Sequence, residues 1–171
     1  MLTVLTVLQS ELRDQYTALR NLQTAEVVYI AAVYHLETIR VRSGSTKALY
    51  AYLGSAPLVT SALAPIVASI HKQAFRLFLH ELHRRGRTTA RAALLEDECL
   101  FLTAACCHRY KQIRARAHTD LAQLQQQFPQ LLWNRRAIFT LLDAVDAVVQ
   151  RADMVSFATA TSASFPHLCL P

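Results

Sequence analysis

Glycine and proline are scarce in this 171-residue chain, which contains three of the first and five of the second. Both residues mark turns between strands, so their scarcity argues against many short strands joined by tight turns. Hydrophobic residues make up 53% of the chain, which is ample for a core. Because the abundant Ala, Leu and Gln favour helices, the composition predicts an all-α protein.

The sequence also lacks the parts that phosphoryl transfer requires. A kinase needs a glycine-rich loop over the phosphates, a lysine that pairs with them, and acidic or amide ligands for the metal. This chain has no glycine-rich loop and no Asp-Phe-Gly motif. We therefore expect no catalytic residue, no cofactor and no metal site in it.

The four cysteines lack the C-x-x-C spacing that brings two thiolates to one metal. They are interpreted as buried free thiols in a reducing compartment, with the cytosol as the default and a disulfide framework as the weaker alternative. Cys107-His108 supplies no setting that would activate a thiol. The N-terminus lacks the basic start of a signal peptide. The cysteines are Cys99, Cys106, Cys107 and Cys169.

Two short polar motifs have a ligand-binding interpretation and a simpler one. His80 and His83 lie three apart on one helical face, as in some metal sites, but no third ligand is nearby, so a solvated face is favoured. Glu96, Asp97 and Glu98 are interpreted as surface acids early in a helix. The aromatic residues do not alternate with basic ones, so nucleic acid is not an expected partner.

Residues 48–70 contain no charged side chain and are long enough to cross a bilayer as a helix. Gly54, Pro57, Pro65 and several Ser and Thr residues make insertion less favourable. A soluble chain is therefore expected, and a membrane protein anchored by residues 48–70 is kept as the weakest interpretation.

Apolar residues recur with the helical period through most of the chain. Thr24 and either Thr88 or Thr89 are candidate N-caps, and Gly44 and Gly86 are candidate stops. No strict repeat period is visible, so residues 1–155 are predicted to form one irregular α-solenoid, HEAT-like or armadillo-like, of stacked antiparallel helices, followed by a tail at 156–171. About seven helices are expected, at 3–21, 25–41, 47–53, 65–85, 89–108, 110–127 and 135–149.

The stretch 110–133 carries one apolar stripe, with Asp120 on the opposite, wet face. Pro129 ends the helix. Phe128 and Trp133 are then expected to meet between this helix and the next, with Leu132 starting the return. In the last predicted helix the residues expected to face inward are Ile138, Leu141, Leu142, Val145 and Val149.

The net charge is +6, and much of it lies in residues 41–87. Such a segment suits an anionic partner. Candidate contacts with anionic lipid or a protein partner are Arg84, Arg85, Arg87, Lys111 and Arg114, with a solvated helix end as the favoured alternative for the first three.

Two ordered segments resemble the helical region of phosphatidylinositol 4-kinase alpha. The first is Lys-x-Ile-Arg at 111–114, followed by Ala117, Leu121 and Leu124 and by Phe-Pro-x-Leu-Leu-Trp at 128–133. The second is Val-Tyr-x-Leu-Glu-x-x-Arg-Val at 33–41, at a compatible distance. The resemblance is specific over about 27–45 and 100–145.

The resemblance implies a scaffold segment upstream of a kinase domain. The family phosphorylates phosphatidylinositol to phosphatidylinositol 4-phosphate at the plasma membrane, together with a tetratricopeptide adaptor, hyccin and a lipidated anchor protein. Implied partners are therefore the rest of a larger kinase chain or adaptor subunits, with weak peripheral contact to anionic membrane. The alternative is a freestanding helical-repeat adaptor. Extensive exposure of apolar residues at the ends of the helical stack would favour a segment of a larger kinase, whereas a chain that is soluble and monomeric by itself would favour the freestanding adaptor.

Overall fold

The computed structural model describes residues 2–133, 135–136, 138–143, 145–146 and 149–150. All regular structure in these ranges is helical, so the predicted all-α class is confirmed. The elements in chain order are α1 (Leu2–Glu11), the 3₁₀ turn η1 (Arg13–Gln15), α2 (Tyr16–Arg20), α3 (Thr24–Ser43), α4 (Lys47–Gly54), α5 (Ala56–Val59), α6 (Ala64–Arg84), α7 (Thr89–Cys106), α8 (Lys111–Gln127) and the 3₁₀ turn η2 (Pro129–Trp133).

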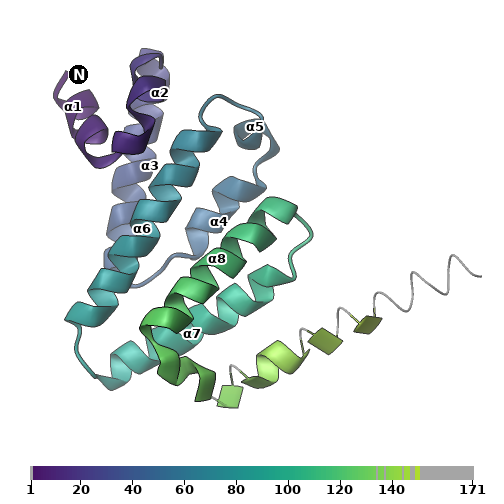
Figure 1. The fold of residues 1–171 in the computed structure, drawn as a ribbon. Coiled ribbons are helices and arrows are strands. Elements are labelled where there is room, and N and C mark those ends of the chain that lie inside the picture. Colours follow the sequence, from purple (N-terminus) through teal and green to yellow (C-terminus); the bar gives the residue numbers. More distant parts are fainter. Residues whose placement is uncertain (1, 134, 137, 144, 147–148, 151–171) are drawn as a thin grey trace, which may run out of the picture.

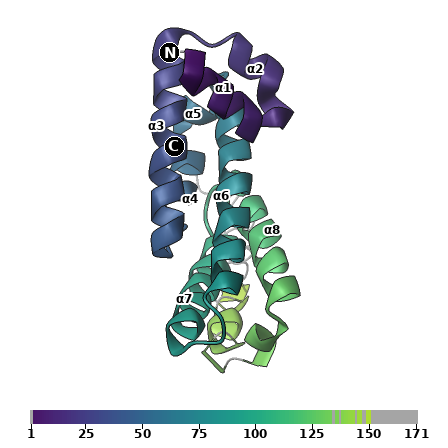
Figure 2. The same ribbon diagram turned by 90° about the vertical axis from the view of Figure 1, so that its left-hand side faces the viewer.

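Helix α6 belongs to both hydrophobic cores of the molecule. Its first half contributes Ile66 and Ile70 to a core shared with α1, α2 and α3. Its second half contributes Phe75 and Phe78 to a core shared with α4, α7 and α8. The two ribbon views show α1 and α2 at one end of α6 and the α7–α8 pair at the other (Figures 1 and 2). The chain is therefore organised around α6.

Helices α3 and α6 lie side by side and run in the same direction. Val27 near the start of α3 shares a core with Ile66 near the start of α6. At the other ends, Arg85 just after α6 donates a hydrogen bond to the carbonyl oxygen of Arg42 at 2.7 Å. Helix α4 returns the chain between them, and α7 and α8 pack as a further pair (Figure 1). This order is compatible with successive hairpins of an α-solenoid.

The N-terminal helix expected at 3–21 is interrupted. A 3₁₀ turn at Arg13–Gln15 separates α1 from α2, and Tyr16, which follows the turn, is 47% exposed. The turn redirects the chain so that Leu12 and Leu19 can both enter the core. The prediction of one helix over 3–21 is wrong. The apolar stripe continues through the turn, so the spacing of apolar residues did not reveal the break.

Most other boundaries lie close to those predicted, with one different cap. Gln23, and not Thr24, caps α3, because its backbone N–H donates to Glu26 Oε2 at 2.8 Å in a capping box. Gly44 follows α3 with φ +100°, a conformation that other residues rarely adopt, and a Cβ there would lie 3.0 Å from Leu94. Thr88 caps α7 by accepting a hydrogen bond from the Arg91 N–H at 3.2 Å.

The predicted last helix, 135–149, is helical at its described positions, but its apolar residues do not face inward. Leu142 is 57% exposed, and Ile138, Leu141, Val145 and Val149 are exposed as well. The prediction of burial is wrong because no described element covers this face. The predicted tail lies outside the described residues.

Residues 48–70 fall on α4, α5 and the start of α6, separated by turns. Among the described residues no helix combines the length and the apolar character that crossing a bilayer requires.

Candidate functional site

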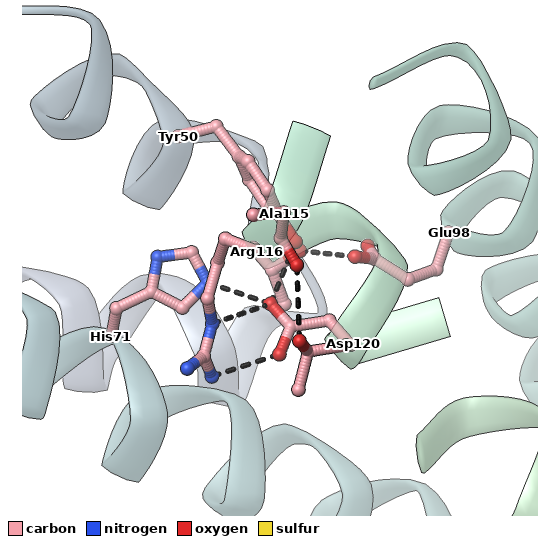
Figure 3. Close-up of polar contacts among 8 residues, drawn as sticks. Tyr50, His71, Glu98, Ala115, Arg116 and Asp120 are labelled. Carbon is pink, nitrogen blue, oxygen red and sulfur yellow. Dashed lines mark hydrogen bonds and ion pairs between the residues drawn. The ribbon is translucent and has the colours of Figure 1, made fainter. Parts of the chain in front are cut away.

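The most unusual feature of the interior is a set of buried charged and polar side chains where α4, α6, α7 and α8 meet (Figure 3). At its centre is Asp120 of α8, whose side chain is fully buried. Its Oδ2 accepts hydrogen bonds from the Tyr50 hydroxyl at 2.7 Å and lies 2.8 Å from His71 Nε2. One carboxylate thus joins three helices.

Arg116 completes the cluster, one turn before Asp120 on α8. Its Nε donates to Asp120 Oδ2 at 3.1 Å, and its second guanidinium nitrogen lies 2.8 Å from Oδ1. A buried carboxylate is costly unless it is paired and hydrogen-bonded, and these contacts supply the pairing. Burial and the Asp120 carboxylate raise the pKa of the Tyr50 phenol well above its ordinary value, so the phenol is a permanent donor.

Glu98 of α7 lies beside this cluster and bonds elsewhere. Its Oε1 accepts a hydrogen bond from the hydroxyl of Thr46, just before α4, and both residues are buried. Burial raises the pKa of Glu98 to about 7. The expectation that residues 96–98 are all surface acids is therefore wrong at Glu98. It holds for Asp97, which is exposed and pairs with Lys47 at 2.8 Å.

A third buried acid, Glu37, joins α3 to α4. Its Oε1 accepts hydrogen bonds from the Tyr52 hydroxyl at 2.9 Å and from Arg40 at 2.5 Å. Burial, followed by the contact with Glu37, raises the pKa of Tyr52 to about 12. Glu37 and Arg40 are the Glu and Arg of the 33–41 segment that resembles the kinase family.

The spacing of these acids relative to apolar residues indicates that they are buried, although the sequence-based prediction placed Asp120 and Glu98 at the surface. Asp120 lies three residues after the buried Ala117 and four before the buried Leu124, so it belongs to the apolar stripe. The prediction that it lies on the wet face is wrong. Glu98 has the same relation to Leu95 and Leu102. His71 and Glu37 lie likewise between buried residues of α6 and α3.

The arrangement suits helix joining and not catalysis. The exposed fractions of His71 and Asp120 are 1% and 0%, so no substrate can reach them. Each hydrogen bond of the cluster connects different helices or adjacent turns of α8. We therefore interpret the cluster as a polar clamp that fixes how the three helices α4, α6 and α8 pack; its members are Tyr50, His71, Arg116 and Asp120.

The basic residues predicted to contact anionic lipid do not form one patch. Arg84, Arg85 and Arg87 lie where α6 ends and α7 begins, and Lys111 and Arg114 lie at the start of α8. These places are opposite ends of the α7–α8 pair (Figure 1), whose 18-residue α7 has a length of about 27 Å.

Three of the five are also engaged within the fold. Arg84 pairs with Glu81 at 2.9 Å, and Arg85 bonds to the Arg42 carbonyl. Arg114 donates to the carbonyl oxygens of His108 and Arg109, both at 2.9 Å, and so ties down the turn before α8. Arg87 and Lys111 have no side-chain partner within the part of the chain that the structure describes.

The predicted contact between Phe128 and Trp133 does not form. Phe128 is buried, with its ring 4.6 Å from that of His83, but Trp133 is 85% exposed. After Pro129 the chain continues as a 3₁₀ turn of three residues per turn, so Leu131, and not Trp133, comes onto the face of Phe128 and is buried. The side chain of Leu132 lies outside the described residues.

The remaining motifs form no recognisable site. His80 and His83 are exposed, and no group of three His, Cys, Asp or Glu residues in the described ranges could hold a metal ion. Burial raises the pKa of Cys99 and of Cys106, which makes both thiols poorer nucleophiles. Within the described ranges these cysteines form no disulfide, and the expectation of burial holds for Cys99, whereas Cys106 and Cys107 are partly exposed.

Comparison with known proteins relates this chain to phosphatidylinositol 4-kinases. Residues 4–166 match the family described as PI4-kinase N-terminal region. The phosphatidylinositol 4-kinase stt4 of Schizosaccharomyces pombe is 28% identical over 143 residues, which cover 82% of this chain and 8% of that protein. The chain thus spans less than a tenth of the relative it matches. No solved structure matches it. Because the family match extends over most of the sequence, the chain belongs to the PI4-kinase N-terminal region family.

Proposed function

We propose that this chain is a helical scaffold segment of a phosphatidylinositol 4-kinase of the alpha type, and that it packs against neighbouring helices of a larger kinase chain or its adaptor subunits. The observation that carries the proposal is the exposed apolar surface at both ends. Ile39 of α3 is 65% exposed, and the apolar face at 138–149 is open. A slice of a helical stack leaves such faces without a partner.

The apolar residues at 138–149 have the spacing of a packing surface. Ile138, Leu142, Val145 and Val149 recur at steps of four, three and four, which places them on one side of a helix. Trp133 and Phe139 nearby in the sequence are exposed as well, and exposed apolar residues gathered on one face mark contact sites. Covering them is the role we assign to neighbouring helices.

Catalysis by this segment is not part of the proposal. Phosphorylation of phosphatidylinositol at the plasma membrane is an activity that we assign to the larger chain. The buried polar clamp fits a scaffold, because a rigid segment transmits position between its neighbours. We further propose that contact with anionic membrane is peripheral and weak, and that Arg87, which has no side-chain partner within the described ranges, contributes to it.

Light scattering of the purified 171-residue chain tests the proposal. The chain alone should self-associate as its concentration rises, and Leu142→Lys should shift it toward monomer. Gln126→Lys, which makes the same new charge on α8, is the control and should leave association unchanged. A parent chain that stays monomeric at all concentrations would favour a freestanding adaptor.

A further inference from the structure

A cavity of about 800 Å³ opens where α6 ends and α7 begins, next to η2. Its lining includes the basic side chains of His83, Arg87 and Arg91 and the hydroxyls of Thr88 and Thr89. No Asp or Glu is among the described residues that line it. The local charge of the cavity is therefore positive.

The two arginines are not neutralised. The other arginines discussed above, at positions 84, 85, 114 and 116, pair with a carboxylate or bond to carbonyl oxygens. Within the described ranges the guanidinium groups of Arg87 and Arg91 have neither a hydrogen-bond partner nor an ionic partner. The guanidinium of Arg91 lies 5.8 Å from the centre of the Phe128 ring, and that contact holds it beside the cavity.

The start of α7 adds hydrogen-bond donors. The Thr88 side chain accepts from the Arg91 N–H, which leaves the N–H groups of Thr89 and Ala90 without a partner inside the helix. His83 Nδ1 lies 2.9 Å from the Leu79 carbonyl oxygen, so its Nε2 is left for a ligand. The cavity combines two guanidinium forks with backbone donors, and this donor set suits an oxyanion.

We propose that this cavity binds a phosphate-bearing ligand, with Arg87 and Arg91 holding the phosphate oxygens. A bare phosphate would leave most of the volume empty, so the ligand has a larger body. The lining also includes the apolar side chains of Leu95 and Leu131 and the amide of Gln127, which suits a phosphate ester that also carries hydroxyl groups. The proposal is independent of the scaffold role and of the exposed apolar ends.

Binding to the 171-residue chain is measured by titration with inorganic phosphate and with glucose 6-phosphate, followed by NMR of the backbone amides. The expected result is a saturable shift of the Thr89 and Ala90 signals, with tighter binding of glucose 6-phosphate. Arg87→Gln and Arg91→Gln should each weaken binding about tenfold, which corresponds to about 1.4 kcal/mol.

Lys111→Gln is the matched control, because it removes the same charge from an unpaired side chain at the other end of the α7–α8 pair. It should leave the affinity within about twofold. If Lys111→Gln lost as much affinity as the arginine variants, the binding would be general electrostatic attraction, and the proposed site would be wrong. Absence of a saturable shift with both soluble phosphates, combined with no vesicle binding that depends on Arg87 and Arg91, would overturn it as well. A melting temperature for each variant shows that the fold is retained.

Vesicles of phosphatidylcholine that contain phosphatidic acid distinguish a lipid headgroup from a soluble phosphate ester. Vesicle binding that Arg87→Gln and Arg91→Gln reduce and Lys111→Gln preserves would assign the site to a lipid headgroup. Binding of glucose 6-phosphate without specific vesicle binding would assign it to a soluble ester. Both results support the site, whereas vesicle binding reduced equally by all three variants, without binding of either soluble phosphate, overturns it.

Discussion

Replacing Asp120 with Ala should destabilise the chain more than the loss of any surface charge. The change leaves the Tyr50 hydroxyl, the His71 Nε2 and the Arg116 guanidinium without the acceptor that they share. His71 and Tyr50 are buried and Arg116 is only partly exposed, so water cannot replace the carboxylate fully.

The expected cost follows from the burial of the partners. Breaking a buried ion pair by removing one member typically costs about 3 to 5 kcal/mol, because the other charge is left uncompensated. Unfolding in urea measures the free energy difference. The matched control is Asp97→Ala, since Asp97 also pairs with a cation at 2.8 Å but at the surface, where a pair contributes about 1 kcal/mol or less.

A second change separates the carboxylate from its neighbours. Tyr50→Phe removes one donor and leaves Asp120 paired with Arg116 and His71, so it should cost about 1 kcal/mol. The double variant with Asp120→Ala should cost less than the sum of the two, because both remove the same hydrogen bond. If Asp120→Ala were no more harmful than Asp97→Ala, the carboxylate would not be a buried centre of the clamp, and the reasoning would fail.

Three further predictions concern stability and activity. Phe128→Ala should cost about 3 to 5 kcal/mol of unfolding free energy and Trp133→Ala about 0.5 kcal/mol or less, because only Phe128 is buried; equal melting temperatures of the two variants would contradict this. The pKa of Glu98 is raised from 4.5 to about 7 in the folded chain, so between these two pH values the native state holds a proton that the unfolded state has lost. The contribution of Glu98 to the free energy of unfolding should therefore be greatest below about pH 4.5 and should fall by on the order of 3 kcal/mol as the pH rises past 7. Glu98→Gln should remove that decline in urea titrations at several pH values, and an unchanged decline would assign it to another group. The purified chain should show no ATP-dependent phosphorylation of phosphatidylinositol, since it lacks the phosphate-binding and metal-binding parts, and lipid product formed by pure protein would refute this.

The helical period located the elements well because most of them bury one face within this chain. The stripe through Ile113, Ala117, Leu124 and Phe128 is buried as predicted. The break at Arg13–Gln15 was not visible, since the apolar spacing continues through it.

The buried acids were missed for a physical reason. Sequence reasoning places a charged residue in water by default, because burial is costly without a partner. Two of the three partners of Asp120, His71 and Tyr50, lie 49 and 70 residues away along the chain. Thr46, the partner of Glu98, lies 52 residues away. Only the fold brings them together, although each acid's position between buried apolar residues was a usable sign.

The outward-facing residues at 138–149 show a different limit. A period of three and four identifies an apolar face, but it does not say whether the covering element belongs to the same chain. The resemblance to the kinase family was carried by the segments that now prove to hold Glu37 with Arg40 and Arg116 with Asp120. Both pairs help to fix helix packing, and neither is a catalytic motif.

The central claim is that neighbouring helices of a larger kinase cover the apolar face at 138–149. It is tested by introducing Leu142→Cys, in the 171-residue chain and in the complete kinase polypeptide, and measuring maleimide labelling at that residue by mass spectrometry. The account predicts rapid labelling of the chain alone and strong protection within the kinase, with Gln126→Cys labelled in both as the control. Equal labelling of Leu142→Cys in the two proteins would contradict it.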